Sequence, residues 1–174
     1  PEHTGEVYLE GEKLNIKSIS GQIDKGFALI PEDRQAQRLV QTMDIEKNCS
    51  LSAMKTYKKA GVFLDSSKEG QKVDEQIKDI HIKVADKRLP ILSLSGGNQQ
   101  KVVIGKGLLT KPKILLLDEP SRGIDIGAKK LVLEYLTKLN RETGLTVIIV
   151  SSELVELRSI SDRIGIVSDG KLAC

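Results

Sequence analysis

Two unbroken apolar runs stand out near the end of the chain. Residues 114–117 and 146–150 have the length of β-strands, and each run leads directly into polar residues. Unbroken apolar runs of this length are typical of parallel strands that are covered on both faces. We therefore predict two parallel strands whose polar carboxyl ends face a ligand-binding edge of the sheet.

The segment between these runs has the spacing of an amphipathic helix. Val132, Tyr135, Leu136 and Leu139 recur at i, i+3, i+4 and i+7. Asp125 is a suitable N-cap, and Gly144 closes the segment. The order strand, helix, strand predicts a right-handed crossover in a parallel sheet.

The earlier part of the chain mixes short strands with a helical region. Residues 26–30 predict a short strand that Pro31 ends, and residues 6–11 alternate like a half-exposed antiparallel strand. Residues 38–90 have helical spacing, a polar break at 65–70 and little strand character, so we interpret them as a helical lobe. The predicted fold class is α/β with some antiparallel strand.

Composition narrows the function classes. The 174 residues are 39% hydrophobic and 29% charged, as expected for a soluble globular domain. The net charge of +3 is scattered, and aromatics make up only 3%, which argues against nucleic-acid binding. Cys49 and Cys174 form no metal or disulfide pattern and suit a cytosolic setting. No apolar run has membrane-spanning length, so we expect a partner protein to provide any membrane role.

A candidate anion site precedes an apolar helix. Ser95, Gly96 and Gly97 lie directly before Val102, Ile104 and the other apolar positions of that helix. Unpaired N–H groups at a helix start attract phosphate, and glycine lets the phosphate come close to the backbone. The structural alternative is that Ser95 only caps the helix and the glycines only turn the chain.

Two carboxylates follow the first apolar run. Asp118 is suited to holding Mg²⁺, and Glu119 is suited to polarising an attacking water as a general base. The alternative interpretation is a simple strand-end turn completed by Pro120.

Taken together, these segments resemble the nucleotide-binding domain of ABC transporters. The signature LSGGNQQK at 94–101, the Walker B motif ILLLDEP at 114–120 and SRGID at the D-loop position, 121–125, occur in the family's order. PEDR at 31–34, the GNQQK form of the signature, RGID-x-GAK and SSEL at 151–154 are similar to the second cassette of tandem sugar importers of the ribose type.

The resemblance implies a P-loop NTPase fold with a division of labour along the chain. Residues 1–37 and 111–174 would form a partial RecA-like ATPase core, ending in a strand at 163–167, and residues 38–110 would form the helical signature subdomain. Glu32 stands where the family has the Q-loop glutamine, and Ser152 stands where it has the switch histidine. The run Gly105-Lys106-Gly107 stands where the family usually has an alanine–arginine pair, and its two glycines are expected to cost the helix about 1 kcal/mol each.

The family's functional roles carry over by motif. The expected catalytic residues are Glu119, Ser152 and Glu32, and the expected Mg²⁺ ligands are Asp118 and Glu32. The expected ATP-binding residues are Ser95, Gly96, Gly97, Asn98 and Asp125.

A Walker A motif, G-x-x-x-x-G-K-[ST], is missing from the sequence. The nearest segment, GEKLNIKS at 11–18, has Ile16 where the second glycine is required, so we interpret it as a surface loop. We expect a cassette truncated before its start, inactive alone, whose Ser95 and Gly97 can still serve a nucleotide held by a partner cassette.

The resulting expectation is an ATP- and Mg²⁺-dependent energy-coupling domain of an importer for a monosaccharide or similar small solute. Its partners would be a second cassette, in the same chain or a homodimer, and transmembrane permease subunits docked on residues 40–51. It would lie on the cytoplasmic face of the membrane.

One alternative is a catalytically degenerate regulatory cassette, favoured by Ser152 and disfavoured by the intact Glu119. Another is a nucleic-acid-linked ABC ATPase, whose basic grooves and long coiled-coil insertions the sequence does not have.

Overall fold

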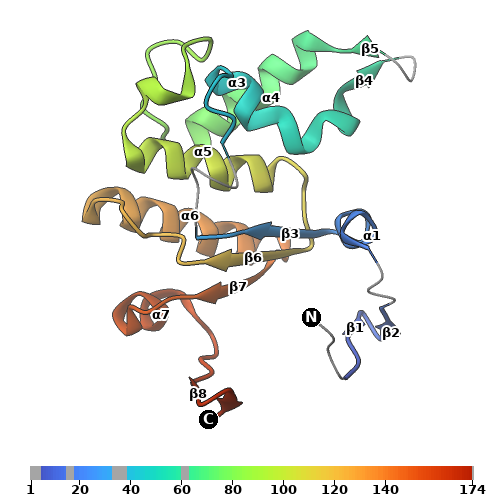
Figure 1. Ribbon diagram of the computed structural model, residues 1–174, viewed down its shortest axis with the longest axis vertical. Helices are drawn as coiled ribbons and strands as arrows, with labels where there is room; N and C mark the ends of the chain where they lie inside the picture. Colours follow the sequence, from blue (N-terminus) through green and yellow to red (C-terminus); the bar gives the residue numbers. More distant parts are fainter. Residues whose placement is uncertain (1–4, 15–17, 33–38, 60–62, 174) are drawn as a thin grey trace.

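The central element is a parallel sheet. The computed structural model describes residues 5–14, 18–32, 39–59 and 63–173. In the sheet, β6 (Ile114–Asp118) lies between β3 (Phe27–Ile30) and β7 (Thr146–Val150), and both neighbours are parallel to it (Figure 1). The predicted strands and their direction are confirmed. Because the strands are parallel and in register, their carboxyl ends meet at one edge.

The predicted crossover helix is also confirmed. Helix α6 (Ile126–Thr143) connects β6 to β7 and buries Val132 and Leu136 against the core. The Asp125 carboxylate accepts the Ala128 N–H at 2.9 Å, which satisfies one of the unpaired donors at the helix start. Gly144 ends the helix with φ of 71°, a left-handed conformation that glycine adopts without strain.

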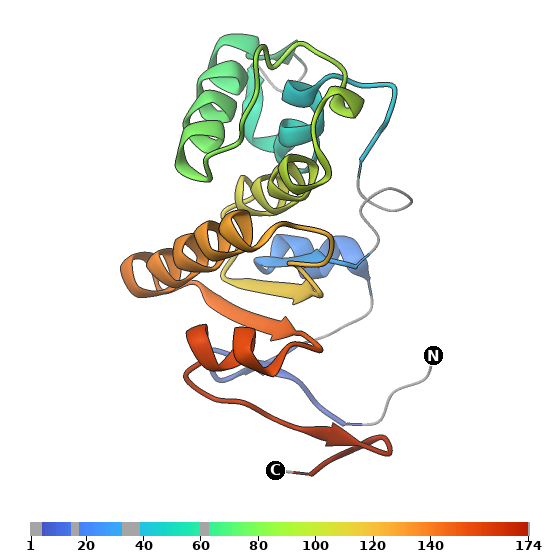
Figure 2. The same ribbon diagram turned by 90° about the vertical axis from the view of Figure 1, so that its left-hand side faces the viewer.

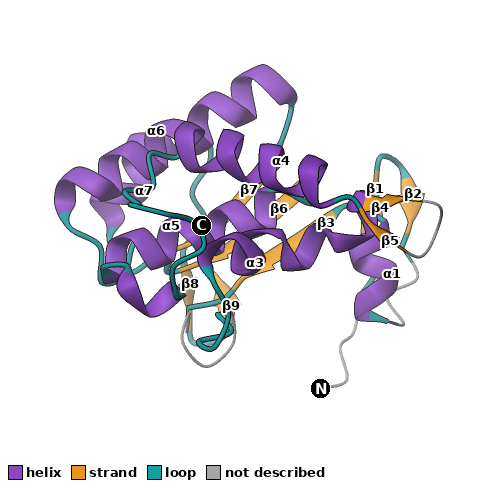
Figure 3. Ribbon diagram, turned by 90° about the horizontal axis from the view of Figure 1, so that it is seen from above, coloured by secondary structure: helices purple, strands orange, loops and turns teal. Residues whose placement is uncertain are grey.

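A group of helices lies on the other side of β3 from β7 (Figures 1 and 3). Helix α4 (Ser66–Asp79) begins inside the polar break predicted at residues 65–70, so that prediction is wrong. Asp65 caps the helix by accepting the Lys68 N–H at 3.0 Å, and the polar residues of the segment are types that favour a helix start. The elements are α3 (Ile45–Ser50), the 3₁₀ segment η1 (Leu51–Tyr57), β4 (Lys58–Lys59), β5 (Phe63–Leu64), α4 (Ser66–Asp79), the 3₁₀ segment η2 (Ile91–Ser93) and α5 (Gly96–Leu108).

Two small hairpins lie at the opposite end of the molecule (Figure 2). The expected strand at 163–167 is wrong, because only Val167 of that range lies in a strand. That strand pairs within a local hairpin, whose turn residues Asp169 and Gly170 both have positive φ. The remaining elements are β1 (Tyr8–Leu9), β2 (Glu12–Lys13), α1 (Ile19–Asp24), α7 (Leu154–Ile160), β8 (Val167–Ser168) and β9 (Lys171–Leu172).

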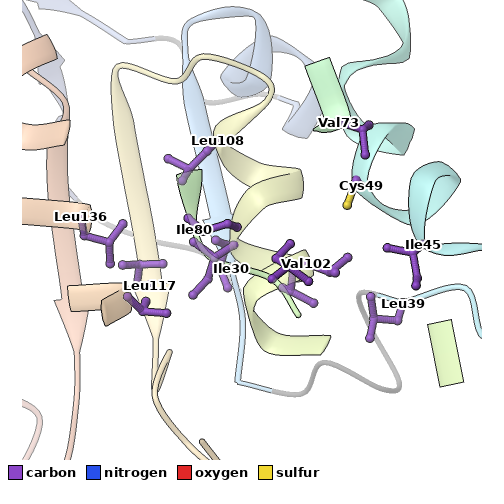
Figure 4. Close-up of a cluster of buried hydrophobic side chains, with 14 of the residues drawn as sticks. Ile30, Leu39, Ile45, Cys49, Val73, Ile80, Val102, Leu108, Leu117 and Leu136 are labelled. Carbon is purple, nitrogen blue, oxygen red and sulfur yellow. The ribbon is translucent and has the colours of Figure 1, made fainter. Parts of the chain in front are cut away.

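One hydrophobic core joins the sheet to the helices (Figure 4). Ile30 and Leu117 from the strands belong to the same buried cluster as Val102 from α5 and Val73 from α4. Glycines make the closest approach possible, since a Cβ on Gly107 would lie 3.1 Å from Ile30 Cδ1. Gly105 and Gly107 therefore permit close packing of α5, in addition to lowering its helix propensity as expected.

Some predicted features fall outside the described residues. These are Asp33 and Arg34 of the PEDR motif, the boundary between residues 37 and 38, Cys174, and residues 15–17 of the rejected phosphate-loop candidate. Across the described ranges, no helix combines the length and apolar character needed to cross a membrane.

Candidate functional site

The loop before α5 presents a serine hydroxyl at a helix start. Ser95 occupies the N-cap position, yet its side chain makes no capping hydrogen bond to the helix. Its Oγ instead accepts a hydrogen bond from the Asn98 amide at 3.0 Å. A hydroxyl that accepts one bond keeps its proton for a second partner. Helix starts of this kind leave N–H donors unpaired, so Ser95 and the first N–H groups of α5 are available to an anion.

Asn98 is fixed at both ends of its amide. Its Oδ1 accepts the backbone N–H of Lys83 at 2.9 Å, while its Nδ2 donates to Ser95. The carbonyl end of the amide is therefore already bonded to the backbone of this chain. The donor end of the amide is thereby directed at Ser95.

The glycines of this loop face the segment that follows β6. A Cβ on Gly97 would lie 3.4 Å from Ile124 Cγ2 and 3.7 Å from Asp125 Oδ2. Asp125 is close enough to influence Lys101, whose pKa is lowered chiefly because burial disfavours its ammonium, with the Asp125 charge acting in the opposite direction. The start of α5 and the start of α6 are thus packed together.

At the carboxyl end of β6 the chain turns sharply. Glu119 has a φ of 44°, which is uncommon for a residue with a side chain. Its N–H donates to Val150 O at 2.9 Å, and its Oε1 accepts the Ser152 N–H at 2.7 Å. The end of β7 and the residues after it therefore hold Glu119 at both its backbone N–H and its carboxylate.

A polar cavity of about 550 Å³ lies where the carboxyl ends of β3, β6 and β7 meet. Glu32, which follows β3, forms an ion pair with Arg122, and Lys129 pairs with Glu153 at 2.5 Å. Ser121 Oγ is buried with no hydrogen-bond partner among the described residues. The lining residues are Glu32, Glu119, Ser121, Arg122, Gly123, Ile124, Lys129, Ser152 and Glu153.

The residues singled out from the sequence fall into two groups. Glu32, Glu119 and Ser152 line one cavity together, and Asp118 is the last residue of β6 beside them. The second group lies at the start of α5 and consists of Ser95, Gly96, Gly97 and Asn98. Gly97 lies beside Ile124, which lines the cavity of the first group, and beside Asp125.

Sequence reasoning missed several polar partners of this site. Ser151 donates to Glu156 at 2.6 Å, and Arg122 pairs with Glu32. Serine and glutamate are ordinary surface residues in a sequence, so their burial and pairing carry no local signal. The only hint was the proximity of these residues to the end of an apolar strand.

The donor set suits Mg²⁺ bound with a nucleotide rather than a metal held by protein alone. Within the ranges described, no three His, Cys, Asp or Glu side chains gather into a metal-binding group. Mg²⁺ commonly takes one or two carboxylates and completes its shell with water and phosphate oxygens. Asp118, at the strand end beside the cavity, supplies a carboxylate of that kind.

Comparison with known proteins identifies relatives along nearly the whole chain. The family model described as "ABC transporter" matches residues 1–122. The "Xylose import ATP-binding protein XylG" of Pseudomonas savastanoi is 41% identical over 170 residues, covering 98% of this chain and 32% of the relative. The "Ribose import ATP-binding protein RbsA" of Geobacillus kaustophilus is 41% identical over 172 residues, covering 99% and 34%. The chain spans about a third of the length of these curated relatives.

Solved structures agree on the fold. The "Dimeric structure of a post-hydrolysis state of the ATP-binding cassette MJ0796 bound to ADP and Pi" matches with a TM-score of 0.84 at 24% identity, covering 98% of this chain and 72% of that one. The "Dimeric Structure of MJ0796, a Bacterial ABC Transporter Cassette" matches with a TM-score of 0.75 at 25% identity, covering 89% and 66%. The expected ABC ATPase fold is confirmed, and with its family match over residues 1–122 this chain belongs to the ABC transporter family.

Proposed function

We propose that this chain is the ATP-binding and ATP-hydrolysing energy-coupling domain of an importer for a monosaccharide or similar small solute. The relatives are named as xylose and ribose import ATP-binding proteins, and the chain aligns with them over 98% or more of its length. ATP is the substrate, and closure of paired cassettes around it is the step that moves a membrane partner.

The observation that carries the proposal is the position of Glu119. Its carboxylate is held by the Ser152 N–H at 2.7 Å and lines the polar cavity at the strand ends. A carboxylate fixed in this way can accept a proton from the water that attacks the γ-phosphate. Bound Mg²⁺ neutralises charge on the phosphates, and Asp118 is the residue that would hold it. Glu32 is tied to Arg122 and contributes charge at the same opening.

The signature end acts on a second nucleotide. Ser95 and the N–H groups of Gly96 and Gly97 form an anion-binding start to α5, and Asn98 orients the hydroxyl. We infer that the phosphates at the signature are bound by the phosphate loop of a partner cassette. Asp125 supports this surface by capping α6 beside Gly97.

We further infer the assembly around this domain. Residues 1–37 with 111–174 would act as the ATPase core of the second cassette in a tandem arrangement, and 38–110 as the signature subdomain. Permease subunits would dock on the helical side around residues 40–51, placing the domain on the cytoplasmic face of the membrane. A net charge of +3 without aromatic clusters gives no support to a nucleic-acid partner.

A second candidate function is a regulatory cassette that hydrolyses ATP poorly itself. Ser152 favours it, because a serine hydroxyl does not carry the charge of a histidine at the γ-phosphate. In that case the signature of this chain would serve the other cassette, and Glu119 would be dispensable.

Glu119→Gln in the intact protein separates the two candidates. If Glu119 is the general base, steady-state ATP hydrolysis falls at least about 100-fold, whereas ATP binding is retained. The matched control is Glu134→Gln on the exposed side of α6, which should leave the rate unchanged. Retention of most of the hydrolysis by Glu119→Gln would favour the regulatory cassette and overturn the catalytic proposal.

A further inference from the structure

A buried carboxylate lies close behind the proposed catalytic site. Glu156, in α7, is only 4% exposed although glutamate is rarely buried in folded proteins. Its Oε2 accepts a hydrogen bond from Ser151 Oγ at 2.6 Å, and its Oε1 is buried with no partner in the described part of the chain. Burying a carboxylate with one oxygen unsatisfied costs stability, so the arrangement calls for an explanation other than packing.

The Ser151 hydroxyl passes the constraint to the neighbouring backbone. While its proton is donated to Glu156, its oxygen accepts the Glu153 N–H at 3.1 Å. These two bonds fix the direction of the hydroxyl and close the turn from residue 151 to residue 153. The peptide N–H inside that turn belongs to Ser152, and it donates to Glu119 Oε1 at 2.7 Å. The peptide bond between Ser151 and Ser152 thus joins two hydrogen bonds, Ser151 Oγ to Glu156 and Ser152 N–H to Glu119, and so connects the two carboxylates.

We propose that Glu156 is a positioning residue for Glu119, acting through Ser151 to aim the Ser152 N–H at the Glu119 carboxylate. The inference rests on the proposed function, in which Glu119 takes the proton from the attacking water. Glu156 is not among the residues that line the polar cavity, so we assign it no direct part in the chemistry. The turn also has an outer restraint, the Lys129–Glu153 ion pair at 2.5 Å. The hydrogen bond from Ser151 to Glu156 sets the direction of the Ser152 peptide, and the ion pair with Lys129 holds the Glu153 side chain.

A positioning role and a purely structural role have different consequences. If the Ser151–Glu156 bond only stabilises the start of α7, its loss lowers the melting temperature and leaves the turnover of folded protein unchanged. If the bond aims the Ser152 N–H, its loss lowers kcat because the general base is misplaced, and ATP binding is little affected. Misplacement by about 1 Å is enough to reduce a rate by up to about 100-fold.

The test is steady-state ATP hydrolysis by Ser151→Ala, Ser151→Thr and Ser159→Ala in the intact protein. Ser151→Ala should lower kcat by about 10-fold to 100-fold with KM for ATP within about twofold, and Ser151→Thr, which keeps the hydroxyl, should recover most of the rate. Ser159→Ala is the matched control, since its hydroxyl donates to the Glu156 backbone at 2.7 Å and not to the turn. If Ser151→Ala does not fold, Ser151→Cys makes the same test, because a thiol is a weak donor and acceptor.

The same changes in a Glu119→Gln background separate this inference from the proposed function. If Glu156 acts through Glu119, Ser151→Ala should reduce the residual rate of Glu119→Gln no further. A kcat unchanged by Ser151→Ala, or an equal fold-loss in both backgrounds, overturns the positioning role even where Glu119→Gln alone lowers hydrolysis as proposed. Normal hydrolysis by Glu119→Gln alone overturns the proposed function, and the positioning role with it.

Discussion

Asn98 donates its side-chain amide to Ser95 Oγ across 3.0 Å, and the carbonyl end of the same amide accepts from Lys83 N at 2.9 Å. The donor end of the amide is therefore directed at the serine by the rest of the chain. Because the serine oxygen accepts this bond, the hydroxyl proton is left to bond a second acceptor. This pair converts an ordinary helix-start serine into a preorganised donor.

We predict that Asn98→Asp reverses this arrangement. The introduced carboxylate still accepts from Lys83 but can only accept from Ser95, so the serine proton turns inward and a negative charge faces the phosphates. Losing one bond to a charged group, about 1.5–3 kcal/mol, should raise KM for ATP in the intact protein at least about tenfold.

The comparison for this prediction is Ser93→Asp, which adds the same charge at an exposed residue without altering the Ser95 bond. Its effect on KM should be clearly smaller. Equal effects of the two substitutions would mean that charge alone, and not the orientation of Ser95, determines binding.

The glycines of α5 give a prediction about stability. Gly107→Ala gains about 1 kcal/mol of helix propensity, but its Cβ would lie 3.1 Å from Ile30 Cδ1 in a packed core. Overpacking of this kind costs about 1–3 kcal/mol, so we expect a net loss of about 1 kcal/mol in unfolding free energy. Urea unfolding of the 174-residue chain measures it.

Gly127→Ala is the control for that measurement, because Gly127 lies in the exposed first turn of α6, where an added Cβ would lie 3.4 Å from Asp125 Oδ1. There the propensity gain of up to about 1 kcal/mol should dominate. A Gly107→Ala protein as stable as Gly127→Ala would contradict tight packing between α5 and β3.

The buried thiol of Cys49 predicts a pH dependence of stability. Burial raises the pKa of Cys49 from 9.0 to about 12, with the charge of Glu46 adding to the rise and that of Lys106 opposing it. The folded state therefore keeps its proton where the unfolded chain loses it. The stabilisation is complete below the ordinary value of 9.0 and is lost as the pH rises towards about 12.

From pH 8 to pH 10 this titration should remove about 1.4 kcal/mol of unfolding free energy. Cys49→Ala should be less stable at pH 8 but should lose less between the two pH values. Burial also raises the pKa values of Tyr57, which is buried, and Tyr135, which is half-buried, from 10.0; their titration acts mainly above pH 10 and equally in the two proteins. The same decline in both proteins would assign the pH dependence to other groups.

Local patterns were sufficient for the sheet and its crossover helix. The apolar runs ending at residues 117 and 150 form β6 and β7. Asp125 and Gly144 cap the two ends of α6, as predicted. These features depend on neighbours a few residues apart, where periodicity and capping act directly. The region at 163–167 was assigned from family resemblance, and the structure places only Val167 of it in a strand, in a local hairpin.

The candidate site was only partly predictable for the same reason. Glu32, Glu119 and Ser152 were named from motifs, and the structure brings them to one cavity. The ion pair of Glu32 with Arg122 and the bond from Ser151 to Glu156 link groups whose sequence shows no pairing signal. Such links depend on how strand ends and loops are brought together, which polar residue types do not encode by themselves.

The sequence by itself determined the main strands, the limits of the crossover helix and the family motifs, because each is written in apolar periodicity, caps and contiguous residues. Only the tertiary structure decided that Asn98 orients Ser95 and that Ser152 offers its backbone N–H, rather than its side chain, to Glu119. A backbone donor is the same in every residue except proline, so its direction is set by the fold around it and not by the identity of the residue.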